Sequence, residues 1–212
     1  MTEDEIRKKY TERYEALKSA AQELKDDITK YLSDKQKFHI DRIDTRAKDI
    51  DRFVAKATKV IEDKQTKESK LKYENPLSQI QDQVGARILI LYLDDVEELS
   101  KTIKNYYGIY EDVTKEPDND YEFKYFGRHF ILSFPTEIRE KYGKDKIPVA
   151  FELQIKTLFQ YAWSECEHDL NYKPHGKEID KEGQRLLALA SAQSWGSDRI
   201  FDELIKKTKL DS

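Results

Sequence analysis

Two carboxylates of this chain are placed to bind a hard metal ion. Asp82 lies just before a nearly continuous apolar segment at 84–93, and Glu152 lies inside a second β-like segment at 147–155. Mg²⁺ binds carboxylate oxygens and usually keeps waters and substrate phosphates as its other ligands. Two acids from adjacent strands would therefore suit the metal-assisted transfer of a phosphoryl-type group.

Four cations surround one predicted junction between a strand and a helix. The strand, 38–48, starts apolar and ends charged on the face shared by its even-numbered residues, and a helix follows from about Asp49. The cations of this basic junction are Arg46, Lys48, Arg52 and Lys56. Guanidinium can bind phosphate bidentately and lysine supplies a point charge. The junction therefore fits a phosphate site, and the competing interpretation is an ordinary exposed basic surface.

Two further signals come from an arginine and from one face of a later helix. Arg87 lies within the apolar segment 84–93, where an arginine is costly unless it is paired or binds a ligand. The helix that follows Ile155 carries, on one face, Tyr161, Glu165, His168 and Tyr172. A purely structural helix would place Lys and Glu there. The face indicates a lined site, and the alternative is a half-buried helix edge.

The elements that would position these residues follow from hydrophobic periodicity. Strands are predicted at 38–48, 84–93, 109–115, 130–134 and 147–155. Helices are predicted at 2–32, from about 49 to 61, and at 75–81, 94–108, 158–173 and 182–207. Segment 62–74 is polar and lysine-rich and is predicted to be a loop. This order predicts an α/β (α+β) fold with a mixed sheet of about five strands and helices packed on it.

Apolar stripes predict which helix faces are buried. In 158–173 the stripe is Leu158, Phe159, Ala162, Trp163, Cys166 and Leu170. In 182–207 it includes Leu186, Leu189, Ala190, Ile200 and Leu204. The N-terminal helix is charged and amphipathic, and we expect it to pack on the domain or on another subunit.

Length and composition exclude several classes of protein. The 212 residues suit a single domain, divided into an N-terminal helix (1–34), a core (35–173) and a helical extension (174–212). Charged residues make up 38% of the chain, but the net charge is only −4, so this is no basic nucleic-acid module by bulk charge. One cysteine excludes a disulfide framework. No apolar segment approaches the ~20 residues of a membrane span, and we expect a cytoplasmic protein.

Five motifs in order resemble a known family. They are Arg46-x-Lys48-x-x-x-Arg52-x-x-x-Lys56, Asp82-x-x-Gly85-x-Arg87, Tyr125-x-x-x-His129, Glu152-Leu-Gln-Ile-Lys-Thr157 and Trp163-x-x-x-Glu167-His168. Over residues 38–173 they resemble the RelA/SpoT-type alarmone synthetase domain, and the terminal helices resemble those of the small alarmone synthetases. The resemblance implies a nucleotidyltransferase-like fold that transfers pyrophosphate from ATP to the 3′ hydroxyl of GDP or GTP, with Mg²⁺.

The resemblance also implies a role for each matched residue. Arg46 and Arg87 would hold the adenine ring of ATP, and Lys48 and Lys56 would contact its phosphates, with Arg52 as an extra nearby cation. Asp82 would bind Mg²⁺, and Glu152 would be a second metal ligand or the base that activates the acceptor. The acceptor would be contacted by Tyr125, His129, Gln154, Tyr161 and His168. An aromatic side chain such as Tyr125 can stack on a base.

Departures from the family pattern concentrate on the acceptor side. The usual Gly-Tyr-Arg-Ser-x-His becomes Lys124-Tyr125-Phe126-Gly127-Arg128-His129, and Tyr161 stands where Asn or His is usual. A guanine nucleotide remains the favoured acceptor. The alternatives are a toxin-type relative that pyrophosphorylates the 3′ end of tRNA or makes adenosine alarmones, with a paired antitoxin, and a catalytically inactive nucleotide-binding regulator. A homo-oligomer could form through the terminal helices.

Overall fold

Five strands form the central sheet of the protein. The computed structural model describes residues 1–33, 38–62, 69–114, 123, 127–172 and 179–210. In spatial order the strands are β1 (Ile40–Ala47), β4 (Val84–Ile90), β7 (Ala150–Thr157), β6 (Arg128–Ser133) and β5 (Ile109–Thr114). The β4–β7 pair is parallel, and the other three neighbouring pairs are antiparallel. The predicted mixed sheet of about five strands is confirmed.

The two central strands, β4 and β7, are the most deeply buried, which explains their nearly continuous apolar sequences. Their half-buried residues fall on alternate positions, at Gly85 and Arg87 in β4 and at Glu152 and Gln154 in β7. One face of the centre of the sheet is therefore polar, although the strands themselves are core strands.

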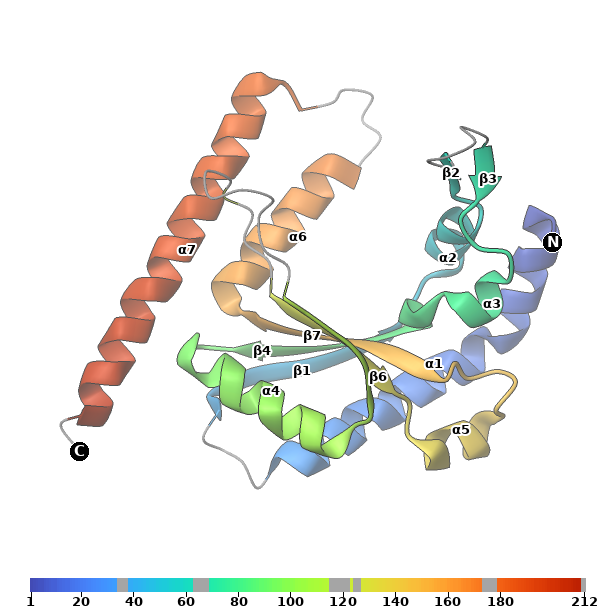
Figure 1. Cartoon of the computed structure of the whole chain (residues 1–212), viewed down its shortest axis with the longest axis horizontal. Coiled ribbons are helices and arrows are strands. Elements are labelled where there is room, and N and C mark those ends of the chain that lie inside the picture. The colour runs from blue at the N-terminus through green and yellow to red at the C-terminus, as the bar shows by residue number, and fades with distance from the viewer. Residues whose placement is uncertain (34–37, 63–68, 115–122, 124–126, 173–178, 211–212) are drawn as a thin grey trace.

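Helix α1 (Glu3–Ser33) runs along the sheet (Figure 1) and packs on β1, β4, α2 and α5. Its buried residues recur every three or four positions and include Ile6, Tyr10, Leu17, Leu24 and Ile28. A capping box starts the helix, because the Glu5 amide donates to the Thr2 hydroxyl (3.2 Å) and the Thr2 amide donates to the Glu5 carboxylate (2.9 Å). The predicted packing of this helix on the domain is confirmed.

Of the remaining helices, those at Asp94–Tyr106 and Thr136–Tyr142 pack beside α1 in the apolar core, and the others flank the polar face or the ends of the strands. The remaining helical elements are α2 (Ile50–Ala57), α3 (Pro76–Gln79), a 3₁₀ turn (Gln81–Gln83), α4 (Asp94–Tyr106), α5 (Thr136–Tyr142), α6 (Leu158–Tyr172) and α7 (Lys181–Leu210). Helices α6 and α7 pack on one another and stand at the end of the central strands opposite to α2 and α3 (Figure 1). Among the described residues, no helix is both long enough and apolar enough to cross a membrane.

Two short elements differ from the sequence prediction. Strand β3 (Ser69–Leu71) lies in the region predicted as a loop, and strand β2 (Val60–Glu62) replaces the end of the helix predicted from about 49 to 61. The two strands form a separate antiparallel hairpin. Helix α5 was not predicted at all. It buries Ile138 but is otherwise mostly polar, and a single apolar position gives no periodicity to detect.

The predicted buried faces of the last two helices are wrong in part. In α6, Trp163 is buried, but Cys166 is exposed and Leu170 is 54% exposed. In α7, the leucines of the predicted core face are exposed, with Leu186 at 60% and Leu189 at 54%. The apolar stripes mark amphipathic helices correctly, but the described part of the chain covers the α6 stripe only in part and leaves Leu186 and Leu189 of α7 exposed.

Polar residues attach α7 to the sheet instead. Its buried side chains include Ser191, Asp198 and Asp202. The Thr157 hydroxyl at the end of β7 donates to Asp198 Oδ2 (2.5 Å). The Asp94 amide at the start of α4 donates to Asp202 Oδ1 (2.7 Å). The helix thus turns a polar face inward, and Leu186, Leu189 and Leu204 face away.

Candidate active site

The strand register brings the predicted site residues into two neighbouring rows on one face of the sheet. In the first row Arg46 is opposite Gly85, and Gly85 is opposite Glu152. In the second row Asp44 is opposite Arg87, which is opposite Gln154, and Gln154 is opposite His129. Side chains of directly opposed residues point to the same face, and positions two apart share it. Four strands therefore supply one continuous polar surface.

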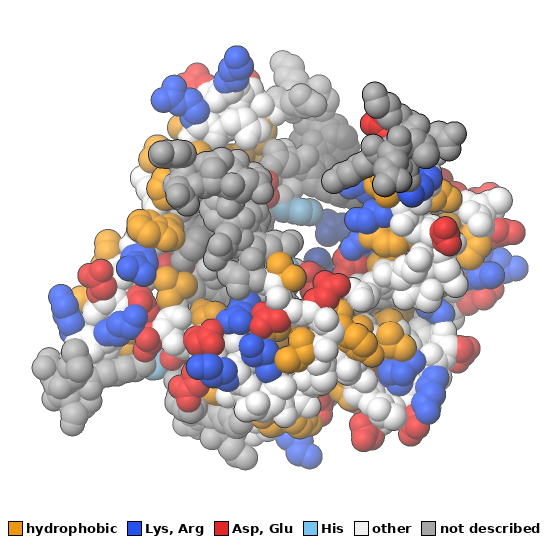
Figure 2. Space-filling model, in the orientation of Figure 1, with side chains coloured by type: hydrophobic (Ala, Val, Ile, Leu, Met, Phe, Trp, Pro, Cys, Tyr) orange, Lys and Arg blue, Asp and Glu red, His pale blue; other side chains and the backbone are white. Residues whose placement is uncertain are grey.

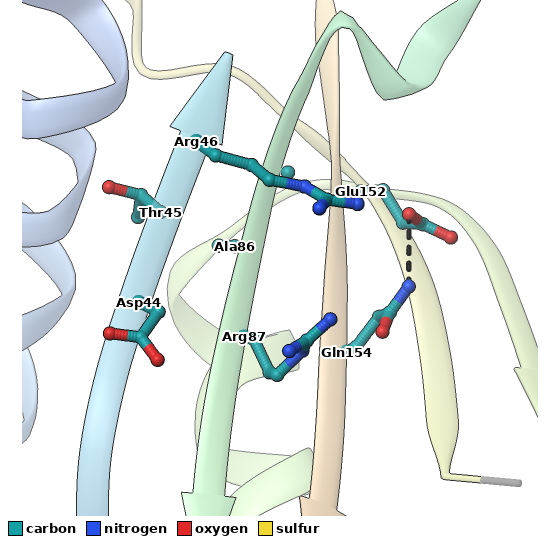
Figure 3. Close-up of a pocket in the computed structure, with 8 residues that line it drawn as sticks. Asp44, Thr45, Arg46, Ala86, Arg87, Glu152 and Gln154 are labelled. Carbon is teal, nitrogen blue, oxygen red and sulfur yellow. Dashed lines mark hydrogen bonds between the residues drawn. The ribbon is translucent and has the colours of Figure 1, made fainter. Parts of the chain in front are cut away.

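A pocket opens on this surface. It is lined by Asp44, Thr45, Arg46, Gly85, Ala86, Arg87, Glu152 and Gln154. It encloses about 400 Å³, part of which is open to solvent. The side chains of Arg46 and Arg87 both reach from their strands toward Glu152 and Gln154 (Figure 3). Histidine and basic side chains also show at the bottom of a hollow between α6 and the α2–α3 region (Figure 2).

Glu152 is held in place by two neighbours in the sheet. Its Oε1 lies 3.2 Å from His129 Nδ1, and its Oε2 accepts a hydrogen bond from Gln154 Nε2 (3.2 Å). The side chain of Glu152 remains 25% exposed, whereas that of His129 is 12% exposed. A carboxylate fixed at both oxygens, yet open to the pocket, is positioned for metal binding or for accepting a proton.

Asp82 lies between two lysines of the basic junction. Its Oδ2 is 2.8 Å from Lys56 Nζ and 3.0 Å from Lys48 Nζ. Its Oδ1 is buried and has no hydrogen-bond partner among the described residues. Two cations against one anion leave this cluster with a positive charge, which suits a phosphate group.

Local structure explains why both lysines reach Asp82. The Asp49 carboxylate caps α2 by accepting from the amides of Asp51 (3.0 Å) and Arg52 (3.2 Å), and this fixes the helix that carries Lys56. The backbone of Lys48 is held by the Tyr10 hydroxyl, which donates to its carbonyl (2.8 Å). The predicted basic junction is therefore brought together at Lys48 and Lys56. Arg46 lies in the pocket, and Arg52 is exposed on α2.

Arg87 has the partners that its position in an apolar strand requires. Its guanidinium forms an ion pair with Glu165 Oε1 of α6 (3.1 Å) and lies 4.6 Å from the centre of the Tyr161 ring. The guanidinium of Arg42 lies 5.2 Å from the same ring. The Arg87 Nε atom is buried and has no hydrogen bond within the described part of the chain. The prediction that Arg87 needs a partner is thus met in part by α6.

The remaining acceptor candidates are placed unevenly. His129 and Gln154 both contact the carboxylate of Glu152. His168 is exposed on α6. Tyr125 lies outside the described residues. Tyr161, assigned to the acceptor by its motif, makes its ring contacts with Arg42 and Arg87.

Gly85 is a site residue that the sequence named only as part of a motif. It lies in the pocket between Arg46 and Glu152 in the register. A Cβ atom added to it would meet nothing within 4 Å among the described residues, so packing does not demand a glycine. Glycine inside a strand often marks the close approach of a ligand. This isolated glycine in an apolar segment is the signal that could have identified it.

The carboxylates fit Mg²⁺ that is bound together with a substrate. No group of three or more candidate ligands (His, Cys, Asp or Glu) able to hold a metal occurs among the described residues, which excludes a complete protein cage there. Mg²⁺ is commonly held by one or two carboxylates, with waters and substrate phosphates completing its shell. The unbonded Oδ1 of Asp82 and the half-buried carboxylate of Glu152 match that requirement.

Two sequence comparisons with known proteins point to the same family. The family described as "Region found in RelA / SpoT proteins" matches residues 45–177. The GTP pyrophosphokinase YjbM of Bacillus subtilis (strain 168) is 32% identical over 129 residues, which is 56% of this chain and 56% of that protein. The chain thus aligns with little more than half the length of this curated relative.

Solved structures show the same fold over nearly the whole chain. Small alarmone synthetase 1 of Bacillus subtilis has a TM-score of 0.72 at 20% identity, covering 95% of this chain and 98% of that one. The smu.1046c protein of Streptococcus mutans UA159 has a TM-score of 0.67 at 25% identity, covering 92% and 96%. The nucleotidyltransferase-like architecture expected from the motifs is therefore that of the small alarmone synthetases, and the chain belongs to the RelA/SpoT family.

Proposed function

We propose that this protein is a Mg²⁺-dependent (p)ppGpp synthetase, an ATP:GTP/GDP 3′-pyrophosphotransferase. The observation that carries the proposal is the pocket that holds Arg46, Arg87 and Glu152, together with the cluster of Asp82, Lys48 and Lys56 at the 3₁₀ turn that leads into β4 and packs on β7. Family membership supports it, as does the name of YjbM, a GTP pyrophosphokinase. Structures of small alarmone synthetase 1 bound to pppGpp and to AMPCPP belong to proteins of the same fold.

The donor side binds ATP through cations of β1, β4 and α2. Arg46 and Arg87 hold the adenine ring. Lys48, Lys56 and Arg52 contact the phosphates. Asp82 would hold Mg²⁺, and Glu152 would either join it as a second ligand or act as the base described below; the metal, when bound, would offset phosphate charge. Binding of the phosphates gives Lys48 and Lys56 new anionic partners beside Asp82, with which both lysines pair in the unliganded chain.

The transfer step requires a base beside the acceptor hydroxyl, and Glu152 has that role. A new bond forms between the acceptor 3′ oxygen and the β-phosphorus of ATP. The bond from that phosphorus to the oxygen shared with the α-phosphate breaks, and AMP leaves. The hydroxyl proton passes to Glu152, whose orientation is set by His129 and Gln154.

On the acceptor side, a guanine nucleotide is contacted by Tyr125, His129, Gln154 and His168. Because the motif around Tyr125 departs from the family pattern, two other acceptors are alternatives: adenosine nucleotides and the 3′ end of tRNA. The net charge of −4 disfavours a polynucleotide, because phosphate contacts provide much of the affinity for nucleic acids. Nucleotide binding alone would not require the pair of carboxylates Asp82 and Glu152, so their presence argues against a regulator that only binds nucleotides.

The test offers labelled ATP, with Mg²⁺, to GDP, GTP, ATP and deacylated tRNA in parallel and separates the products. We expect AMP release with formation of guanosine tetra- or pentaphosphate. Transfer only to tRNA or only to ATP would reject the guanine acceptor in favour of a toxin-type function. The assignment of the ATP-binding residues would be unaffected. Binding of ATP without release of AMP for any acceptor would identify a regulator.

We also propose that the protein works in the cytoplasm as a homo-oligomer through its terminal helices. The support is the exposed apolar face of α7, which includes Leu186, Leu189, Ile200 and Leu204. Light scattering of the purified chain should give a mass above 25.1 kDa, and Leu189→Glu should lower it. If the chain is a monomer at all concentrations, self-association is rejected, and the exposed face of α7 would instead bind a different protein, such as an antitoxin.

A further inference from the structure

Two residues of α6, Tyr161 and Glu165, converge on one side chain of the pocket, that of Arg87. Tyr161 and Glu165 are four residues apart, so they share one face of the helix. Helix α6 follows β7 directly, and it packs against β4, which carries Arg87. The ring of Tyr161 lies 4.6 Å from the Arg87 guanidinium, and Glu165 Oε1 lies 3.1 Å from one of its terminal nitrogens.

We propose that Tyr161 and Glu165 are positioning residues for ATP, which act by holding the Arg87 guanidinium against the adenine ring. This inference rests on the proposed function, in which Arg87 binds the donor nucleotide. It moves Tyr161 from the acceptor side, where its motif position places it, to the donor side.

The contacts of Tyr161 support the donor side. The ring is approached by two cations, Arg42 of β1 at 5.2 Å and Arg87 of β4 at 4.6 Å. Arg42 is itself tethered, since its Nε donates to Asp44 Oδ2 (3.1 Å), and Asp44 lines the pocket opposite Arg87. The ring therefore connects the two strands that supply the donor-side arginines, β1 and β4.

Restraint of Arg87 has a clear purpose. An arginine side chain has many rotamers, and ordering it upon binding reduces affinity. Glu165 anchors one edge of the guanidinium while Tyr161 supports the group by a cation–π contact. The side chain of Arg87 is only 18% exposed, and its Nε has no hydrogen bond among the described residues, so its position depends strongly on these two contacts.

The test separates donor from acceptor binding. Affinity for AMPCPP, a non-hydrolysable ATP analogue, is measured by calorimetry, and the KM of the acceptor is measured at saturating ATP. We expect Tyr161→Ala to weaken AMPCPP binding by about 3- to 20-fold, the range of a partly desolvated cation–π contact. Tyr161→Phe keeps the ring and should stay within about twofold. Glu165→Gln should weaken binding by about 2- to 5-fold. The acceptor KM should not change.

A double-mutant cycle then shows whether Tyr161 acts through Arg87. In an Arg87→Ala background, Tyr161→Ala should have no further effect on AMPCPP binding, because the contact is already lost. Cys166→Ala is the matched control on an exposed position of the same helix and should bind like the wild type.

Three results would overturn the inference: unchanged AMPCPP affinity in Tyr161→Ala, tighter binding in that variant, or a change confined to the acceptor KM. Tighter binding would mean that α6 competes with ATP for Arg87. A wild-type chain that fails to bind AMPCPP would reject the proposed function, and this inference with it. Wild-type binding with unaffected variants would reject the inference alone.

Discussion

Asp82, in the turn before the central strand β4, and Asp112, on the edge strand β5, each lie between two cations. Asp112, on the edge strand β5, uses both oxygens: Oδ1 accepts from Arg128 Nε (3.1 Å), and Oδ2 accepts from Arg128 and from Lys104 (3.0 Å each). Asp82, beside the pocket, binds Lys48 and Lys56 through Oδ2 alone, and its buried Oδ1 has no partner among the described residues.

One arginine from each region repeats the contrast. Arg128 bonds to carboxylates through all three of its nitrogens, those of Asp112 and Glu97. Arg87 has one carboxylate, one aromatic ring and a buried Nε without a hydrogen bond in the described chain. A buried polar atom left unsatisfied is costly and needs an explanation. We infer that the edge network is complete and structural, whereas the cluster at the pocket is completed by a ligand.

The largest expected difference between the two regions is in catalysis. Asp82→Asn or Glu152→Gln should lower the rate of AMP release by ~10²–10³ or more, since each removes a preorganised charge at the reacting phosphates. Asp112→Asn is the matched control and should transfer at the wild-type rate. Activity within a few-fold of wild type for both pocket variants would mean that the centre has been assigned to the wrong residues.

A smaller effect, on nucleotide binding, is expected when a side chain is added to the pocket than when one of its carboxylate charges is removed. Gly85→Val places a side chain where a Cβ meets nothing within 4 Å among the described residues, so the fold should tolerate it. Valine also favours strands over glycine by up to ~1 kcal/mol, so the melting temperature should stay equal or rise. Binding of AMPCPP should nevertheless weaken at least about tenfold, the equivalent of ~1.4 kcal/mol.

The control lies beside the edge strand. A Cβ at Gly108 would approach Ser133 Oγ to 2.7 Å, so Gly108→Ala should disturb local packing without weakening AMPCPP binding. Loss of stability together with loss of binding in Gly85→Val would show that this glycine serves the fold and not the ligand.

The sequence was sufficient for the sheet and for most of the polar surface on it. Long apolar segments identify β4 and β7 as central, and period-two alternation in β1 places Asp44 and Arg46 on one face. Once these strands pair, the register alone brings Arg46 toward Glu152. The roles of the individual residues remain predictions, because register gives neighbours and not ligands.

Contacts between elements far apart in sequence were not predictable. The periodicity of α6 shows that Tyr161 and Glu165 share a face, but it does not show that this face lies over Arg87 of β4. The periodicity of α7 likewise shows an amphipathic helix, but its attachment by Asp198 and Asp202 depends on hydrogen bonds from Thr157 and the amide of Asp94. Which face is covered is a property of the partner surface.

A moderate effect is expected when single cations are removed. Lys56→Ala or Arg46→Ala should weaken AMPCPP binding by about tenfold, as expected for a charge-assisted hydrogen bond of ~1.5 kcal/mol, and the loss should shrink as salt increases. Arg128→Ala should leave binding unchanged and lower the free energy of unfolding. Equal AMPCPP affinity in both pocket variants and the wild type would show that the basic junction is an ordinary exposed surface.

The smallest expected effect is on the free energy of unfolding, and it depends on pH through Asp112 of the edge network. The hydrogen bonds from Arg128, and then those from Lys104, hold the pKa of Asp112 below its usual value despite partial burial. A lowered pKa in the folded state means that the ionised carboxylate stabilises the fold above its unfolded pKa of ~3.9, and that this contribution is lost as the pH falls through the folded value. Asp112→Asn should therefore reduce the free energy of unfolding by ~1 kcal/mol or less at pH 7, because the pair is partly exposed.

Urea unfolding at pH 7 and at pH 3 measures this contribution. The difference between wild type and Asp112→Asn should be fully present at pH 7 and smaller at pH 3, because the contribution declines once the pH falls below the unfolded pKa of ~3.9. Asp26→Asn on the exposed side of α1 is the control and should show little difference at either pH. A difference that stays constant from pH 7 to pH 3 would mean that Asp112 stabilises the edge by packing and not by charge. The contrast with Asp82 would then rest on geometry alone, because the edge carboxylate would no longer be an ion-pair partner whose charge the fold uses.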